Sequence, residues 1–214
     1  MSGTPRSIGQ VSDPRELVLP DLAAWRAWLD TNEDTADEAW LVLAKKGKPA
    51  PTTLTHATAL EEALCSGWID AISRSRDDAT SLQRFCKRRP RSTWSARNVE
   101  IAERLVAEGR MRPRGLAEME RAKADGRWAA AYPGPATITV PDDLAAALAS
   151  HPAAAAAFAA LSSQNRYALL FRLHHLKTEA ARVRNIEKYV AMLESGETLY
   201  PQREAAGGQE RPAE

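Results

Sequence analysis

The sequence predicts an α+β protein that is mostly helical, with a small antiparallel sheet in the N-terminal half and an all-α helical C-terminal region. Two observations lead to this class. Short apolar segments bounded by charged or turn residues lie before residue 90, and they are typical of strands. After Ser95, apolar residues recur at intervals of three and four up to Leu193, which is the period of helices. A chain of 214 residues with 44% hydrophobic residues is long enough to bury a core without disulfides.

Helix caps and strand patterns define the elements of the N-terminal half. Asp21 is a suitable N-cap for a helix that places Trp25 and Leu29 on one apolar face. Thr55 caps a second helix, and Gly67 supplies the left-handed residue that ends it. The apolar segments predict strands over residues 39–44, 68–75 and 80–87, the last two joined by a turn at Asp77-Asp78.

The remaining chain is predicted to be helical. Ser95 caps a helix that Gly109 closes, and a second helix begins at Pro113 and stops at Gly126. Residues 132–141 hold three prolines and a glycine and are the best linker candidate. Four helices are predicted after it, the last ending at Gly196. The predicted organisation is a disordered N-terminus (1–14), an α+β domain (15–132), a helical C-terminal domain (133–200) and a disordered tail (201–214).

The net charge of +1 gives no general attraction to nucleic acid or membranes, but local charges are uneven. Residues 13–38 hold eight acids and two arginines, whereas residues 84–97 hold six bases and no acid. Residues 166–188 hold six bases and two acids. These segments either pair with one another as solvated faces or form an anion-binding surface.

No motif for cofactor, phosphate-loop or metal chemistry is present in the sequence. Neither a G-x-x-x-x-G-K nor a G-x-G-x-x-G pattern occurs, and the four histidines lack ligand spacing. The sequence therefore predicts no cofactor and no metal. Glu61-Glu62 is assigned to the outside of a helix, and Cys65 to the core as a small buried side chain.

The expected location is the cytoplasm. Residues 1–10 are polar and no apolar segment of a signal peptide follows them. No apolar run approaches the ~20 residues that a transmembrane helix needs.

Aromatic and basic residues around the second and third strands form the main candidate site. On a strand, Trp68 and Asp70 share a face, so the pair is expected at the floor of a pocket with arginines at its rim. The alternative is a half-buried tryptophan beside a carboxylate that Arg84 neutralises. The candidate ligand-binding residues are Trp68, Asp70, Arg88, Arg89, Ser92, Trp94, Ser95 and Asn98, with no catalytic residue assigned.

A second basic patch is expected on the last two helices. Its residues lie off the apolar stripes and are Arg166, Lys177, Arg182 and Arg184. Such a face is solvated, paired with nearby acids, or in contact with phosphate groups. Nucleic acid is disfavoured because no groove-reading motif accompanies the patch.

Several ordered blocks resemble the YdeI/OmpD-associated family, often labelled bacteriocin-protection proteins. The resemblance extends from about Asp21 to Pro201. Its main elements are Ala39-Trp40-Leu41, Glu62-Ala63-Leu64-Cys65, Gly67-Trp68-Ile69-Asp70, Arg88-Arg89, Trp94-Ser95, Arg127-Trp128, Asn165-Arg166-Tyr167 and the pattern Lys177, Arg182, Arg184, Ile186. The resemblance implies a role in protection from envelope-active peptides or stress, without an established enzymatic activity.

Three functions are compatible with the sequence. The favoured one is a non-enzymatic protection protein that binds an anionic small molecule or an envelope-related protein partner. The second is an enzyme on small substrates that uses Asp70 as a base beside an arginine-lined anion pocket. The third is a nucleic-acid-binding regulatory module.

Overall fold

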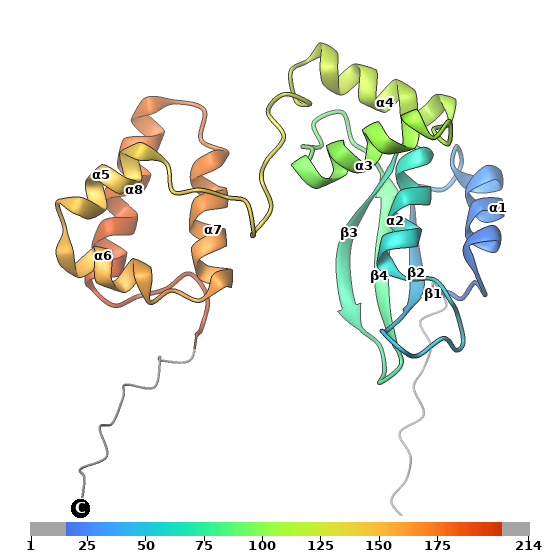
Figure 1. Ribbon diagram of the computed structural model, residues 1–214, viewed down its shortest axis with the longest axis horizontal. Coiled ribbons are helices and arrows are strands. Elements are labelled where there is room, and N and C mark those ends of the chain that lie inside the picture. The colour runs from blue at the N-terminus through green and yellow to red at the C-terminus, as the bar shows by residue number, and fades with distance from the viewer. Residues whose placement is uncertain (1–15, 203–214) are drawn as a thin grey trace, which may run out of the picture. The chain divides into compact units, whose positions relative to one another are not determined.

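The computed structural model describes residues 16–202, and these form two compact units, one ending at Ala131 and one starting at Tyr132 (Figure 1). The predicted disordered N-terminus, residues 1–14, lies outside the described residues, as does the predicted disordered tail, 201–214, except for Pro201 and Gln202. The predicted α+β class with dominant helices is confirmed.

The N-terminal unit holds the sheet and four helices. Its elements are β1 (Glu16–Leu17), α1 (Leu22–Asn32), β2 (Glu38–Ala44), α2 (His56–Cys65), β3 (Trp68–Ser75), β4 (Thr80–Lys87), α3 (Ala96–Ala107) and α4 (Pro113–Ala124). The predicted caps are confirmed: the side chains of Asp21, Thr55 and Ser95 each accept a hydrogen bond from an amide three residues further on. Gly67 adopts a φ of 70° directly after α2, as expected for a left-handed helix end.

The sheet is mixed, so the prediction of a purely antiparallel sheet was wrong. Its order is β1-β2-β4-β3, with β2, β4 and β3 antiparallel and β1 parallel to β2. A parallel pair needs a long crossover connection, and here α1 supplies it. A strand of only two residues carries no alternation, which is why the sequence pattern did not reveal β1.

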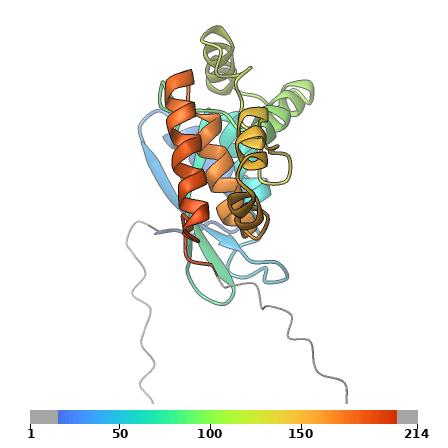
Figure 2. The same cartoon turned by 90° about the vertical axis from the view of Figure 1, so that its left-hand side faces the viewer.

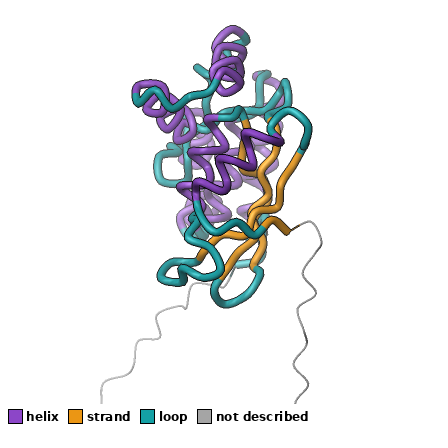
Figure 3. The backbone as a smooth tube through the Cα atoms, turned by 90° about the vertical axis from the view of Figure 1, so that its right-hand side faces the viewer, coloured by secondary structure: helices purple, strands orange, loops and turns teal. Residues whose placement is uncertain are grey.

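Helices α1 and α2 cover one face of this sheet and leave the other face bare of helices from the same unit (Figures 1 and 3). The covered face carries the core, in which Trp25, Trp68 and Phe85 are fully buried. The rings of Trp25 and Phe85 lie 5.6 Å apart, which joins α1 to β4. Trp40 and Arg84, which are paired in register on β2 and β4, belong to the opposite face.

The turn between β3 and β4 is organised by one carboxylate. Asp77 Oδ1 accepts hydrogen bonds from the amides of Ala79 and Thr80, at 2.8 and 2.7 Å. Its Oδ2 accepts from the Thr80 hydroxyl at 2.8 Å and from Arg76 Nη1 at 2.7 Å. The Thr80 hydroxyl, with smaller contributions from the amides and the guanidinium, lowers the pKa of Asp77 to about 2.

This depressed pKa gives a testable pH dependence. Because the pKa in the folded state lies below the ordinary value of 3.8, Asp77 stabilises the fold fully above that pH and loses its effect as the pH falls through about 2. We expect carbon-13 NMR titration of the carboxyl group to give a midpoint near the lower value. Thr80→Val should move the midpoint upward, whereas Thr139→Val in the other unit should not. A wild-type midpoint near 3.8 would contradict this account.

A carboxylate that the sequence assigned to a helix exterior is buried. The Glu62 side chain is 1% exposed, although its neighbour Glu61 is partly exposed. Arg26 binds both carboxylate oxygens of Glu62, at 2.8 and 2.9 Å. Arg112 Nη2 donates at 2.5 Å, and Arg110 Nη2 lies 3.6 Å away. This ion-pair network joins α1, α2 and the segment between α3 and α4.

The C-terminal unit consists of four helices: α5 (Asp142–Ala149), α6 (Pro152–Ala159), α7 (Ser163–His174) and α8 (Glu179–Glu194). Helix α8 contacts each of the other three, and Figure 2 shows it running alongside α7. Their core includes Leu144, Phe158, Leu169, Leu173 and Val190. Within residues 16–202, no helix is both long enough and apolar enough to cross a membrane, in agreement with the sequence.

Candidate anion-binding site

The bare face of the sheet carries a hollow of about 560 Å³ in the N-terminal unit. Basic residues dominate its charged lining. The lining residues are Asp37, Glu38, Ile69, Ala71, Arg84, Cys86, Lys87, Arg88, Arg89, Pro90 and Ser92. We call this feature the basic hollow.

Strand alternation explains which side chains reach the basic hollow. Successive side chains of a strand point to opposite faces, and Phe85 lies in the core. Arg84 and Cys86 therefore lie on the bare face, next to Ile69, which pairs with Cys86 in register.

Two of the basic residues are already paired with the acidic N-terminal segment. Arg84 Nη1 lies 2.9 Å from a carboxylate oxygen of Glu38. Lys87 Nζ lies 3.5 Å from Asp37 and donates to the carbonyl of Asp34 at 2.8 Å. Part of the uneven local charge in the sequence is thus neutralised within the unit.

Arg88 is buried and held in place by Trp94. Its guanidinium carbon lies 3.5 Å from the centre of the Trp94 ring, and its Nη1 donates to the carbonyl of Thr93 at 3.2 Å. Trp94 is itself buried and lies 4.7 Å from Trp128, measured between ring centres. The cation–π contact and the aromatic pair fix the direction of this positive charge before any ligand arrives.

Arg89 and Ser92 close the rim through a tight turn. The Arg89 amide donates to Ser92 Oγ at 3.0 Å, and the Ser92 amide donates to the Arg89 carbonyl at 2.9 Å. The Arg89 guanidinium is exposed and has no ion pair with any residue in the described range. A fixed backbone with a free cation is a suitable contact for an anion.

Trp68 and Asp70 do not form the floor of this hollow. Trp68 is fully buried in the core, where its ring meets Trp28 at 5.8 Å. Asp70 lies on the same face as Trp68, and its Oδ2 is 2.9 Å from Nε2 of His56, the first residue of α2. The sequence correctly predicts that these two side chains share a face of the sheet. That face is the one covered by helices, and the neighbour of Asp70 is His56 instead of Arg84.

Ser95 and Asn98 serve the start of α3. Ser95 Oγ accepts the Asn98 amide at 3.1 Å, and Asn98 is buried. Neither residue lines the basic hollow. Of the eight predicted ligand-binding residues, the structure brings Arg88, Arg89 and Ser92 to the hollow, with Trp94 behind Arg88.

The second basic patch does not converge on one site. Arg182 donates to both oxygens of Asp143, at 2.7 and 2.9 Å, which lowers the pKa of that carboxyl group. Arg166 lies over the ring of Phe158, at 4.6 Å from its centre. Lys177 and Arg184 are exposed and have no ion pair with other residues of the described segment.

The thiols of both cysteines are at least half-buried, which lowers their reactivity. Burial raises the pKa of the Cys65 thiol to about 11, and it also raises the pKa of Cys86. In the described part of the chain, no three His, Cys, Asp or Glu side chains are grouped so that they could hold a metal ion.

Sequence reasoning missed Arg84 and Lys87 as members of the site. For Arg84 the signal was present, because Arg84 and Cys86 alternate along β4 with the apolar Phe85. For Lys87 it was not, because alternation assigns Lys87 to the face of Phe85.

Fold and site together define a two-unit protein in which an α+β unit with a basic sheet face precedes a four-helix unit. Residues 137–196 match the family model described as "Bacteriocin-protection, YdeI or OmpD-Associated". This match confirms the predicted resemblance to the family for residues 137–196 of the chain. Residues 17–118 match a model described as a domain of unknown function (DUF8412). No curated protein and no solved structure matches the chain.

Proposed function

We propose that this chain is a non-enzymatic, cytoplasmic bacterial protection protein that acts by binding a phosphate-bearing anion in the basic hollow. The observation that carries the proposal is the charge of its lining. Four bases, Arg84, Lys87, Arg88 and Arg89, face two acids, Asp37 and Glu38. The family match of the C-terminal unit supports the protective role.

The geometry favours binding over catalysis. Asp70, the residue that a base mechanism would use, is not among the lining residues of the basic hollow. A general base must reach the group that it deprotonates, and the flanking residues Ile69 and Ala71 take that place on the bare face. The lining cations offer charge and hydrogen-bond donors, which suffice to hold an anion.

Binding can be tested with pyrophosphate as the probe. We expect pyrophosphate to raise the midpoint of thermal unfolding of the full chain, and the effect to weaken with added salt. Arg89→Gln should lower the affinity by about tenfold or more, because a hydrogen bond to a charged group contributes about 1.5–3 kcal/mol. The matched control is Arg97→Gln, an exposed arginine of α3 outside the hollow.

Protection requires a cellular measurement. Cells that express the wild-type chain should survive a bacteriocin better than cells that carry Arg89→Gln, with Arg97→Gln behaving as wild type. The proposal would be refuted by equal survival with all three chains, or by an affinity for pyrophosphate that Arg89→Gln leaves unchanged.

A further inference from the structure

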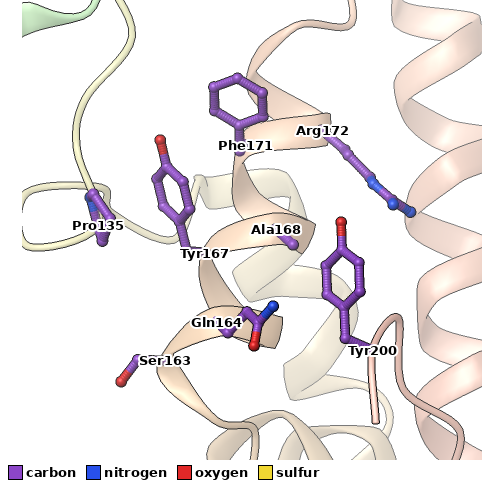
Figure 4. A pocket seen from close by; sticks show the side chains of 8 residues that line it. All are labelled: Pro135, Ser163, Gln164, Tyr167, Ala168, Phe171, Arg172 and Tyr200. Carbon is purple, nitrogen blue, oxygen red and sulfur yellow. The ribbon is translucent and has the colours of Figure 1, made fainter. Parts of the chain in front are cut away.

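The C-terminal unit has a second hollow with a different chemistry. It has a volume of about 590 Å³ and lies along α7 and the segment around Tyr200 (Figure 4). Volumes of about 300–1,000 Å³ are typical of small-molecule sites. Its lining residues are Pro135, Ser163, Gln164, Tyr167, Ala168, Phe171, Arg172 and Tyr200. We call this feature the aromatic hollow.

Helix α7 has two apolar faces, and only one of them belongs to the core. Leu169 and Leu173 are buried in the four-helix core. Tyr167 and Phe171, four residues apart, lie together on the other face and line the aromatic hollow. Residues 132–135 cover part of this second face, and the aromatic hollow is the part that they leave open.

The aromatic side chains of this face are prearranged. Phe171 lies 4.9 Å from Tyr132 and 5.5 Å from Tyr167, measured between ring centres. The Tyr167 hydroxyl donates to the carbonyl of Pro133 at 3.4 Å. Burial raises the pKa of Tyr167, so its phenol stays neutral. The hollow thus offers a flat apolar wall that does not have to form on binding.

Tyr200 forms the opposite rim on a fixed backbone. The fully buried amide of Asn165 binds both backbone groups of Tyr200: its Nδ2 donates to the carbonyl at 3.0 Å, and its Oδ1 accepts the amide at 2.8 Å. The Tyr200 side chain nevertheless remains 40% exposed. A buried side chain therefore holds the backbone of Tyr200 in place while its ring stays accessible to a ligand.

Arg172 supplies the charge. It is exposed, and it makes no hydrogen bond or ion pair with any residue between 16 and 202. Figure 4 shows its guanidinium on the side of the hollow toward which the Tyr200 hydroxyl points. An adjoining hollow of about 440 Å³ shares Phe171 and Arg172 and adds Lys188, which also lacks an ion pair within the described chain. Arg172 lies in the last turn of α7, where a positive charge interacts favourably with the helix dipole. This interaction does not explain why aromatic residues lie beside it.

We propose that the aromatic hollow binds an aromatic carboxylate, with Arg172 holding the carboxylate group and Tyr167, Phe171 and Tyr200 contacting its apolar body. A guanidinium binds a carboxylate through two parallel hydrogen bonds, and an aromatic wall accommodates a flat apolar group. The carboxylate comes either from a free acid or from the C-terminus of a peptide. This site shares no residue with the basic hollow.

The test compares matched probes by isothermal titration on the full chain. The probes are 2-naphthylacetate and its neutral analogue 2-naphthylethanol. We expect the acid to bind at least about tenfold more tightly, equivalent to 1.4 kcal/mol. Arg172→Gln should remove that difference without changing the affinity for the alcohol, whereas Tyr200→Ala should weaken both probes. The matched control Arg184→Gln, an exposed arginine of α8, should leave both affinities unchanged.

Two further arms separate the possible sources of the carboxylate and the two sites. Tighter binding of N-acetyl-leucyl-phenylalanine than of naphthylacetate, lost in its C-terminal amide, assigns the hollow to peptide ends; the reverse order assigns it to free acids. Arg89→Gln should not affect naphthylacetate, so failure at one site is distinguishable from failure at the other. Equal affinity for acid and alcohol, an unaltered acid affinity in Arg172→Gln, or no binding of either probe overturns the proposal.

Discussion

Glu62→Ala is expected to destabilise the N-terminal unit by about 3–5 kcal/mol, the cost of removing one partner of a buried ion pair. Arg26 and Arg112 direct their guanidinium groups at this carboxylate, which is 1% exposed. Without it, Arg26 has no ion-pair partner among the described residues, and Arg112 keeps only the longer ion-pair contacts with Asp30 and Glu33, at 3.5 and 3.7 Å. The change is measured by urea denaturation followed through tryptophan fluorescence, which reports on this unit alone because all six tryptophans lie between Trp25 and Trp128.

The control for this prediction is Glu120→Ala. Glu120 forms a single exposed pair with Lys123 on α4, at 2.8 Å. Surface pairs of this kind contribute about 0.2–1 kcal/mol. Similar losses of stability in the two variants would show that the Glu62 network does not hold the helices together.

Gly115→Ala is expected to destabilise the same unit by about 3 kcal/mol through overpacking. A Cβ at Gly115 would lie 2.4 Å from the carbonyl oxygen of Cys65 and 2.8 Å from that of Leu64. Both carbonyls belong to the last turn of α2, so α4 can approach α2 this closely only at a residue without a side chain. Urea denaturation with tryptophan fluorescence again provides the measurement.

The control is Ala117→Ser, which adds one heavy atom at an exposed position of the same helix, α4. We expect its effect on stability to stay within about 1 kcal/mol, the small difference in helix propensity between the two residues. An effect of Gly115→Ala no larger than this would rule out the close contact of α4 with α2.

The regular elements were accessible from the sequence because they depend on local signals. Strands β3 and β4 occupy the predicted residues. Their apolar segments and the Asp77-Asp78 turn between them are local signals that indicate where each strand begins and ends. The caps Asp21 and Thr55 were equally clear. By contrast, β1 acquires its structure only from its partner β2, far along the chain.

The site was harder to predict because sequence patterns tell which residues share a face, but not which face is covered. Trp68 and Asp70 do share a face, yet α2 lies on it. Glu61 and Glu62 are adjacent and chemically identical, and both bind distant arginines, yet only Glu62 is buried. Such distinctions depend on tertiary packing, which the local periodicity of a sequence does not reveal.

The β-bulge in β3 between Asp70 and Ser73 determines which side chains of the strand face each side of the sheet beyond it. Three steps on β3 accompany two on β4, so one residue is inserted and the in–out phase of the strand reverses beyond it. As a result Arg74 lies over the indole of Trp40, 4.5 Å from its centre. If the same residues formed a regular strand without the bulge, Arg74 would turn toward the helices and Ile72 would follow the core phase. The pattern of charge on this surface therefore depends on the extra residue as well as on residue type, because that residue decides which face every later side chain of β3 joins.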